Sequence, residues 1–408
     1  MASSVEIDPL EARRERVFGP RTEEHRRFAE DRGIVAFGET WWRDHHDTLF
    51  KLGYALRSRY HPNWTPPWRG TGRSYKGYEE GQSAHRTIVM DAIRRSDGSF
   101  VTLKRMNIAH GKSDIEEIEI NKYLSSTALA ADPRNHTAQA IETFQLPDEQ
   151  DVYILVMPSL RPLDDPLFTT FGEAVAFFTQ LFEGLQFMHE HRIAHRDCCH
   201  DNVMMDATPM YPEPWHPIKL DMRRDWKGKA RHYTRTERPV KYYYIDFGLA
   251  QHYKPEHIQP WPPFTLPVHG GDKTAPENQE DKYDKPCNPF ATDIYYLGNL
   301  IRESFMQVCF PSLALNVHNQ IRSQKYYGFG FMRKLVADMV QDEPSKRPEI
   351  TEIVTRFAKI RESLHTWKLR SRTIPRKEWK IDTLWRYPLH IARTVRFVVT
   401  RKPVIPDP

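Results

Sequence analysis

The chain has 408 residues, of which 39% are hydrophobic and 28% charged, with a formal net charge of +5. These values are typical of globular proteins, and the length allows two lobes plus extensions. The chain lacks the roughly eighteen-residue apolar run of a transmembrane helix, the N-terminus lacks the apolar core of a secretory signal, and its four cysteines do not resemble a disulfide framework.

Residues 1–78 are predicted to form an N-terminal arm. A charged segment at 11–32 has helical character, and an aromatic, proline-rich stretch follows from 41 to 68. Proline at that density precludes a regular helix, and tryptophan rings are usually buried. We expect the stretch to pack on a neighbouring surface rather than to bind a partner as a peptide.

Residues 79–160 are predicted to form a small β-rich lobe with one main helix at 113–125. A turn at Gly98 joins the first two strands, and period-two alternation and β-branched residues mark the strands. They are expected at 87–92, 100–104, near 138–144 and at 152–157.

Residues 161–363 are predicted to form a larger helical lobe. Apolar residues at helical spacing indicate helices over 171–191, 293–306, 331–339 and 350–364. A short hairpin begins at Asn202 and resumes at 242, with residues 206–241 as an inserted loop. Within that loop, residues 221–241 carry a local charge of +5. A solvated loop is the favoured interpretation, and contact with an acidic or phosphorylated partner, or with nucleic acid, is the alternative.

Residues 364–408 are predicted to form a basic tail. Residues 367–402 carry a local charge of +9, which leaves −9 for the chain outside the two basic segments. The mildly amphipathic stretch 389–397 either rests on an anionic membrane surface or folds back on the acidic body, and we favour the second arrangement.

Two motifs dominate the second lobe. Asn202 follows the aspartate of His195-Arg196-Asp197 by five residues, and Asp246-Phe247-Gly248 comes downstream. Phosphoryl transfer needs one carboxylate to orient the attacking hydroxyl, and an asparagine oxygen and a second carboxylate to hold Mg²⁺ against the phosphates. Either motif alone also fits an ordinary capped turn, but both in this order predict phosphoryl-transfer chemistry.

With these motifs the chain resembles the protein kinase family over roughly residues 80–363. The resemblance extends to Ala275-Pro276-Glu277, to Asp293 with Gly298, and to Arg347, and it implies a Glu277–Arg347 ion pair. It also implies an α+β, bilobal fold with a small β-rich N-lobe and a larger helical C-lobe. Small-molecule phosphotransferases of similar fold generally lack the Ala-Pro-Glu segment and its arginine, which favours a protein kinase.

The resemblance implies a catalytic set that uses ATP and Mg²⁺. Asp197 would be the base, with Asn202 and Asp246 as metal ligands. Lys104 would hold the nucleotide phosphates and Glu117 would orient it. Glu116 and Glu119 compete with Glu117 for that role.

The resemblance also implies an adenine site at the end of the strand 152–157. Met157 corresponds to the gatekeeper, and Leu160 keeps the N–H that would face the base. Pro158 replaces the usual acidic residue but retains the carbonyl that the hinge uses. A plain buried strand is equally consistent with this segment alone.

The phosphate-covering loop departs from the family pattern. If Val89 lies on the second strand, Gln82, Ala84 and Thr87 stand where glycines let backbone amides approach phosphate. The glycines at 70, 72 and 77 lie too far upstream of Val89 to form this loop unless a long insertion separates them from the second strand.

The catalytic loop departs as well. Cys199 occupies the position of the lysine that stabilises the transferring phosphate in Ser/Thr kinases, and Gly270 aligns with the threonine that accompanies that lysine. His200 is the nearby basic residue that could replace this lysine, and it is charged only when protonated. Redox sensitivity of Cys199 is a further hypothesis, because the thiol would lie beside Asp197.

The sequence therefore predicts an ATP- and Mg²⁺-dependent protein kinase that phosphorylates a protein hydroxyl, with serine or threonine favoured. The alternatives are a pseudokinase that acts as scaffold or allosteric partner, and a small-molecule phosphotransferase. We expect an intracellular location, cytoplasmic with the nucleus as the alternative.

Overall fold

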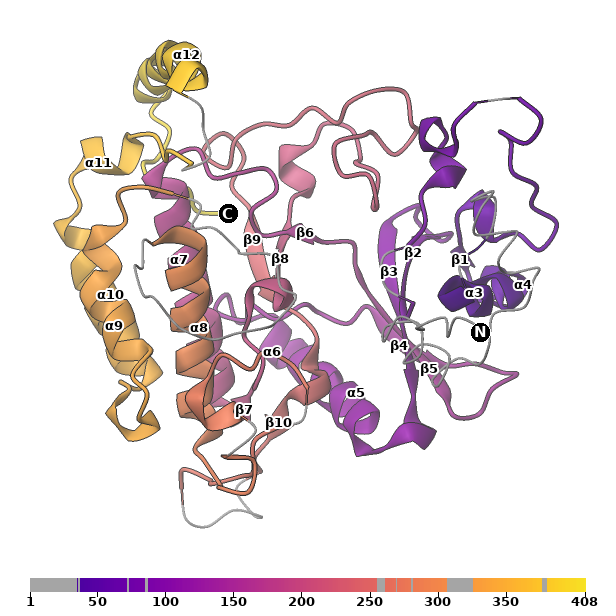
Figure 1. Ribbon diagram of the computed structural model, residues 1–408, viewed down its shortest axis with the longest axis horizontal. Helices are drawn as coiled ribbons and strands as arrows, with labels where there is room; N and C mark the ends of the chain where they lie inside the picture. The colour runs from indigo at the N-terminus through magenta and orange to yellow at the C-terminus, as the bar shows by residue number, and fades with distance from the viewer. Residues whose placement is uncertain are drawn as a thin grey trace, which may run out of the picture. The chain divides into compact units, whose positions relative to one another are not determined.

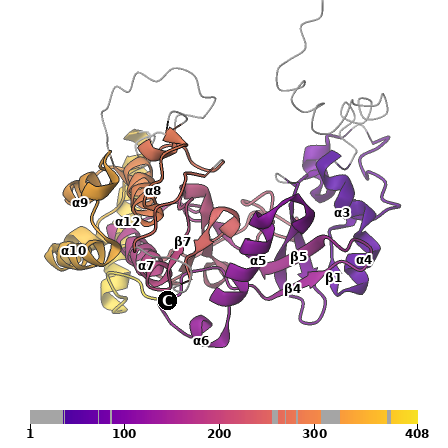
Figure 2. The ribbon, with the colours of Figure 1, turned by 90° about the horizontal axis from the view of Figure 1, so that it is seen from below.

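The computed structural model describes residues 35, 37–71, 73–84, 87–254, 261–268, 270–279, 282–306, 326–375 and 380–408, without the side chains of 110 and 380–384. The helix predicted at 11–32 and Cys309 lie outside these residues. The chain divides into two compact units, one of Met1–Arg105 with Trp215–Ala230 and one of Met106–Pro214 with Arg231–Pro408. Figures 1 and 2 show the elements of both.

The first unit contains a short antiparallel sheet. Strand β1 (Tyr54–Ala55) pairs with β2 (Val89–Arg94), which pairs with β3 (Phe100–Asn107) in a register that places Val89 opposite Lys104. Gly98, at φ +73°, makes the turn between β2 and β3, where a left-handed conformation favours glycine. The strands predicted at 87–92 and 100–104 are confirmed. β1 was not predicted, and it lies inside the segment that we expected to be an arm.

The aromatic stretch packs into the first unit, as expected. Helices α3 (Thr40–Asp44) and α4 (His46–Lys51) precede β1, and Trp42, Tyr60 and Trp68 are buried. The connection from β1 to β2 therefore spans residues 56 to 88. A connection of this length is compatible with the long insertion considered above, which would separate the upstream glycines from Val89.

Buried arginines hold this connection in place. Arg57 lies 3.1 Å from Asp91 and 3.2 Å from Glu79, and Arg59 lies 3.1 Å from Glu39. Buried charges persist only where they are paired and hydrogen-bonded. The network thus fixes the connection against β2.

Residues 215–230 of the inserted loop also belong to the first unit. Arg224 lies 2.9 Å from Asp91, His216 lies 3.0 Å from Glu79, and the Trp226 indole donates to the carbonyl of Gly77 at 2.9 Å. The favoured interpretation as a solvated loop was therefore wrong for these three side chains, which contact groups of the first unit, whereas Lys227 and Lys229 are exposed.

The second unit is mainly helical. Its strands pair as two hairpin-like pairs, β4 with β5 and β8 with β9, together with β6 against β8 and β7 against β10. The strands are β4 (Glu142–Gln145), β5 (Val152–Pro158), β6 (Arg161–Pro162), β7 (Ile193–Ala194), β8 (Val203–Asp206), β9 (Lys241–Tyr244) and β10 (Gln251–His252). The helices are α5 (Lys112–Leu124), α6 (Thr127–Ala130), α7 (Phe171–Glu190), α8 (Pro289–Phe305), α9 (Arg333–Met339), α10 (Ile350–Ser363), α11 (Thr366–Arg370) and α12 (Lys380–Val399).

Helix α7 is the centre of this unit. Most of its side chains are buried, and α10, α11 and β9 pack around it. The Thr170 hydroxyl accepts from the Glu173 N–H at 3.2 Å and so caps the first turn. The helices predicted at 113–125, 171–191, 293–306, 331–339 and 350–364 are confirmed, as are the strand at 152–157 and the hairpin interrupted by the insert. The α+β fold class expected from the sequence is also confirmed.

The basic tail folds back on the second unit, as favoured. Arg396 lies 3.5 Å from Glu237, the Lys402 ammonium donates to the Glu237 carbonyl at 3.3 Å, and Phe397 is buried. Figure 1 draws α12 at the margin of this unit, near α11. Within the described residues, no helix combines the length and apolarity needed to span a bilayer.

Candidate active site

The hairpin β8–β9 brings the two sequence motifs together. Val203 faces Tyr244 across the hairpin, and the Ile245 N–H donates to the Asn202 carbonyl at 3.0 Å. Asn202 immediately precedes β8 and Asp246 follows Ile245, so both residues lie at the same end of this hairpin. Asp246 has φ +64°, a left-handed conformation that is uncommon outside glycine and concentrates at functional sites.

Asp197 is held by donors on both carboxylate oxygens. The Asn202 side-chain amide donates to Oδ2 at 2.7 Å, and the Asp272 N–H donates to Oδ1 at 2.9 Å. Burial raises the pKa of Asp197, and these donors oppose that shift. The result is a partly buried carboxylate in one defined orientation.

Gly271 packs directly against this carboxylate, and sequence reasoning missed it. A Cβ at Gly271 would lie 3.0 Å from Asp197 Cγ and 2.8 Å from Leu249 Cδ1, and its φ is +62°. The threonine of the family pattern had been aligned with Gly270, one residue earlier. The Gly270-Gly271 pair was the available signal, since adjacent glycines often mark close backbone approach.

A buried aspartate supports the catalytic loop from α8. Asp293 is fully buried and accepts from the N–H of His195 at 2.8 Å and from that of Arg196 at 2.6 Å. The His195 ring donates from Nε2 to the Ile245 carbonyl at 3.0 Å. The first motif is therefore fixed both to α8 and to the strand that leads into the second motif.

Glu117 on α5 lies beside the second motif. A Cβ placed on Gly248 would be 3.1 Å from Glu117 Oε2 and 3.4 Å from Asp246 Oδ1. The Ser113 hydroxyl donates to the Gly248 carbonyl. Glu117 is buried, so two carboxylates share this small region, an arrangement that a cation stabilises.

Met157, Pro158 and Leu160 lie at the end of β5 and just after it. Met157 packs against a buried cluster that contains Met106 and Ile118, and all three candidate adenine-site residues are partly buried.

The remaining candidates belong to the first unit. Lys104 lies buried on β3 opposite Val89. The Ala84 N–H donates to Glu39 Oε1 at 2.6 Å, and the Gln82 carbonyl accepts from Arg57 at 2.7 Å. The Ala84 amide is therefore directed at a carboxylate of its own unit, whereas a glycine-rich loop directs such amides at phosphate.

Cys199 does not have the properties of a reactive cysteine. Burial, with the Asp197 charge next, raises the pKa of its thiol to about 12, whereas reactive cysteines have lowered pKa values. The raised pKa of the thiol disfavours the hypothesis of redox sensitivity. His200 has its ring nitrogens 3.2 Å from carboxylate oxygens of Asp164 and Asp201.

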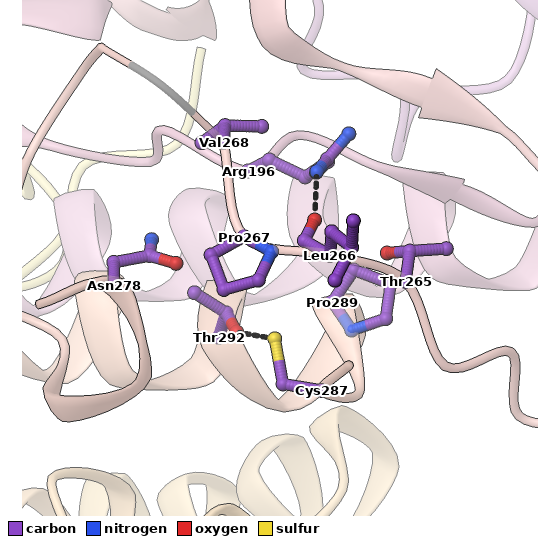
Figure 3. A pocket seen from close by; sticks show the side chains of 9 residues that line it. All are labelled: Arg196, Thr265, Leu266, Pro267, Val268, Asn278, Cys287, Pro289 and Thr292. Atoms are coloured by element: carbon purple, nitrogen blue, oxygen red, sulfur yellow. Dashed lines mark hydrogen bonds between the residues drawn. The ribbon is translucent and has the colours of Figure 1, made fainter. Parts of the chain in front are cut away.

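Arg196 connects the catalytic loop to the segment before α8. Its guanidinium donates to the Leu266 carbonyl at 2.9 Å, on the wall of a small pocket (Figure 3). Cys287 and Thr292 line the same pocket, with the thiol sulfur 4.0 Å from the Thr292 hydroxyl oxygen.

The ion pair expected between Glu277 and Arg347 is present. Two parallel contacts of 2.6 and 2.8 Å join the guanidinium to the carboxylate, and the Thr292 hydroxyl donates to the same carboxylate at 2.8 Å. Burial would raise the pKa of Glu277, but the hydrogen bonds and charge of Arg347 outweigh burial and lower it.

The donor set at the hairpin end fits Mg²⁺. Asn202 uses its side-chain NH₂ for Asp197, with contacts to the Asp197 carboxylate and carbonyl at 2.7 and 3.0 Å, which leaves its side-chain oxygen as a metal donor. Asp246 adds a carboxylate, and oxygen ligands of these two kinds are those that Mg²⁺ prefers.

In the comparison with known families, the family model described as "Protein kinase domain" matches residues 81–357 of the 408. No curated protein matches the sequence.

Proposed function

The chain belongs to the protein kinase domain family, and on that premise we propose that it transfers the γ-phosphate of ATP to a protein hydroxyl, with serine or threonine favoured. The single observation that carries the proposal is the oriented carboxylate of Asp197. The Asn202 side chain and the Asp272 N–H donate to it, and Asn202 and Asp246 flank the hairpin β8–β9 that follows the Asp197 loop.

Asp197 accepts the proton of the attacking hydroxyl in this proposal. The contacts from Asn202 and Asp272 hold its carboxylate in one orientation before substrate arrives, and such positioning supplies much of the rate in phosphoryl transfer. Bound Mg²⁺ would neutralise charge on the phosphates. Asn202 and Asp246 would hold it through oxygen atoms.

The family assigns the remaining roles. Lys104 would hold the nucleotide phosphates with Glu117 as its partner. Met157, Pro158 and Leu160 would line the adenine site, and Gln82, Ala84 and Val89 would cover the nucleotide. Glu117 lies close to Gly248 of the second motif, which supports its assignment to this site.

A pseudokinase is the second candidate function, and two observations favour it. Cys199, a neutral thiol, occupies the position of the phosphate-stabilising lysine, and the Ala84 amide is engaged by Glu39. Because of these two features, fewer positive charges and fewer hydrogen-bond donors would face the phosphates. In that case the fold would act as scaffold or allosteric partner. An intracellular location, cytoplasmic or nuclear, stays a prediction.

Incubation with labelled ATP, Mg²⁺ and generic protein acceptors tests the proposal. The wild type should label acceptors, whereas Asp197→Asn and Asp246→Asn should lower the rate by a factor of at least about 10³. Asp206→Asn, at the far end of β8, where the side chain accepts from the nearby Thr208 N–H at 3.0 Å, is the matched control and should keep full activity. Stabilisation of the wild type by ATP without any transfer would instead support the pseudokinase.

A further inference from the structure

Helix α12 presents an apolar outer face. Seven large hydrophobic side chains are exposed on it, among them Trp385 at 73%, Leu389 at 66% and Val399 at 75%. The others are Tyr387, Ile391, Val395 and Val398. Contiguous exposed apolar surface of this kind marks an interaction site.

The opposite face of α12 is the one that docks on the second unit. The His390 ring contacts the Arg370 carbonyl at 3.1 Å, and Phe397 is 4% exposed. At about 100° per residue, Trp385, Ile391, Val395 and Val399 project away from these two residues. The helix is therefore held by one face while its apolar face remains outward.

The charged side chains of this part of the chain are basic, although one of them, Arg396, already lies 3.5 Å from Glu237. Residues 385–402 contain five basic side chains and no acidic one. A helix with aromatic and aliphatic side chains on one face and arginines on its flank is the pattern of helices that lie in the plane of a membrane surface.

A cavity of about 240 Å³ adjoins the apolar face. Arg372, Arg386 and Arg393 line it together with two threonines, and none of its lining residues is acidic. Leu389 belongs both to the cavity wall and to the outer face. The cavity thus has guanidinium groups next to apolar surface, which suits the phosphate of an amphipathic anion.

We propose that α12 docks on an anionic phospholipid surface, with its outer apolar side chains inserted between the lipids and a lipid phosphate in the arginine-lined cavity. A second copy or a protein helix would also cover the apolar side chains. An anionic leaflet in addition complements the five basic residues and the arginine cavity, because each basic group near such a surface adds to binding. The inference does not depend on kinase activity.

Flotation of the full chain with vesicles tests the inference. We expect binding to phosphatidylcholine vesicles that contain phosphatidylserine, weak binding to phosphatidylcholine alone, and loss of binding at high salt. Arg386→Gln with Arg393→Gln should weaken binding about twenty-five-fold, from about fivefold for each arginine. Trp385→Ser with Leu389→Ser should abolish it.

Trp367→Ser is the matched control, since Trp367 is 77% exposed but lies on α11, and it should bind like the wild type. Three results would overturn the inference: no binding to the anionic vesicles, equal binding to neutral vesicles, or a dimer in solution that the Trp385/Leu389 double variant dissociates while no vesicle binding occurs. Binding of soluble glycerophosphoserine without vesicle binding would overturn it as well, because the cavity would then serve a free phosphate. Thermal unfolding of each variant confirms that it is folded.

Discussion

At the scale of single residues, the orientation of Asp197 depends on a backbone segment rather than on a side chain. Gly271 lets the chain pass close enough for the Asp272 N–H to reach Asp197 Oδ1 at 2.9 Å. The carbonyl of Asp272 in turn accepts from the Tyr296 hydroxyl of α8. A backbone amide thus contacts the carboxylate in a loop that lacks the family's lysine and threonine.

We predict that Gly271→Ala lowers the transfer rate about a hundredfold, because an added Cβ would displace Asp197, and misplacement by about 1 Å can cost that much. Gly270→Ala is the matched control, since Gly270 also has positive φ, +109°, but open space around its Cβ position. Steady-state kinetics separates the two variants. An equal effect of both substitutions would show that backbone strain, and not contact with Asp197, is responsible.

At the scale of elements, the Glu277–Arg347 pair joins three segments of the second unit. The guanidinium also donates to the Ala291 carbonyl at 2.9 Å and lies over the Tyr295 ring, so it contacts the first turns of α8. The pair thereby anchors the end of the segment that contains Gly271 and Asp272.

We predict that Arg347→Met lowers the free energy of unfolding by about 3–5 kcal/mol, because it leaves a buried carboxylate without its cation. Arg356→Met should cost only about 0.2–1 kcal/mol, because its pair with Asp338 is partly exposed. Denaturant unfolding measures both. Adding Glu277→Gln to Arg347→Met should recover part of the loss, and failure to do so would contradict the role of the unpaired charge.

The pH dependence of that pair has a defined sign. The folded-state pKa of Glu277 is lowered. The contribution of the ionised carboxylate to the free energy of unfolding is therefore complete above the ordinary glutamate pKa and is lost as pH falls through the lowered pKa. The stability difference between wild type and the double variant should therefore narrow in acid.

At the scale of the whole molecule, the chain leaves the second unit at Pro214, contributes Trp215–Ala230 to the first unit, and returns at Arg231. Arg224 and Arg57 share the carboxylate of Asp91. The insert therefore completes a buried charge network whose other members come from the N-terminal part of the chain.

We predict that Arg224→Gln with Trp226→Ala destabilises the first unit by about 1–3 kcal/mol, because Asp91 keeps Arg57 but loses its second partner. Hydrogen exchange should become faster in residues 74–94. Lys227→Gln, an exposed position in the same loop, should leave exchange unchanged. Unchanged exchange in the double variant would mean that the insert does not support this unit.

The main helices and strands and the hairpin that carries the two motifs could be predicted from the sequence, because they follow from local periodicity and from motifs of neighbouring residues whose chemistry requires specific residue types. The Glu277–Arg347 pair joins residues far apart in the chain, and the resemblance to the protein kinase family was what implied it. The tertiary structure alone decided that β1 pairs at Tyr54 with Arg94, that Arg224 reaches Asp91, and that Gly271 contacts Asp197. Each of these joins residues distant in the chain, and such contacts are selected by packing and by the pairing of buried charges, which no local pattern records.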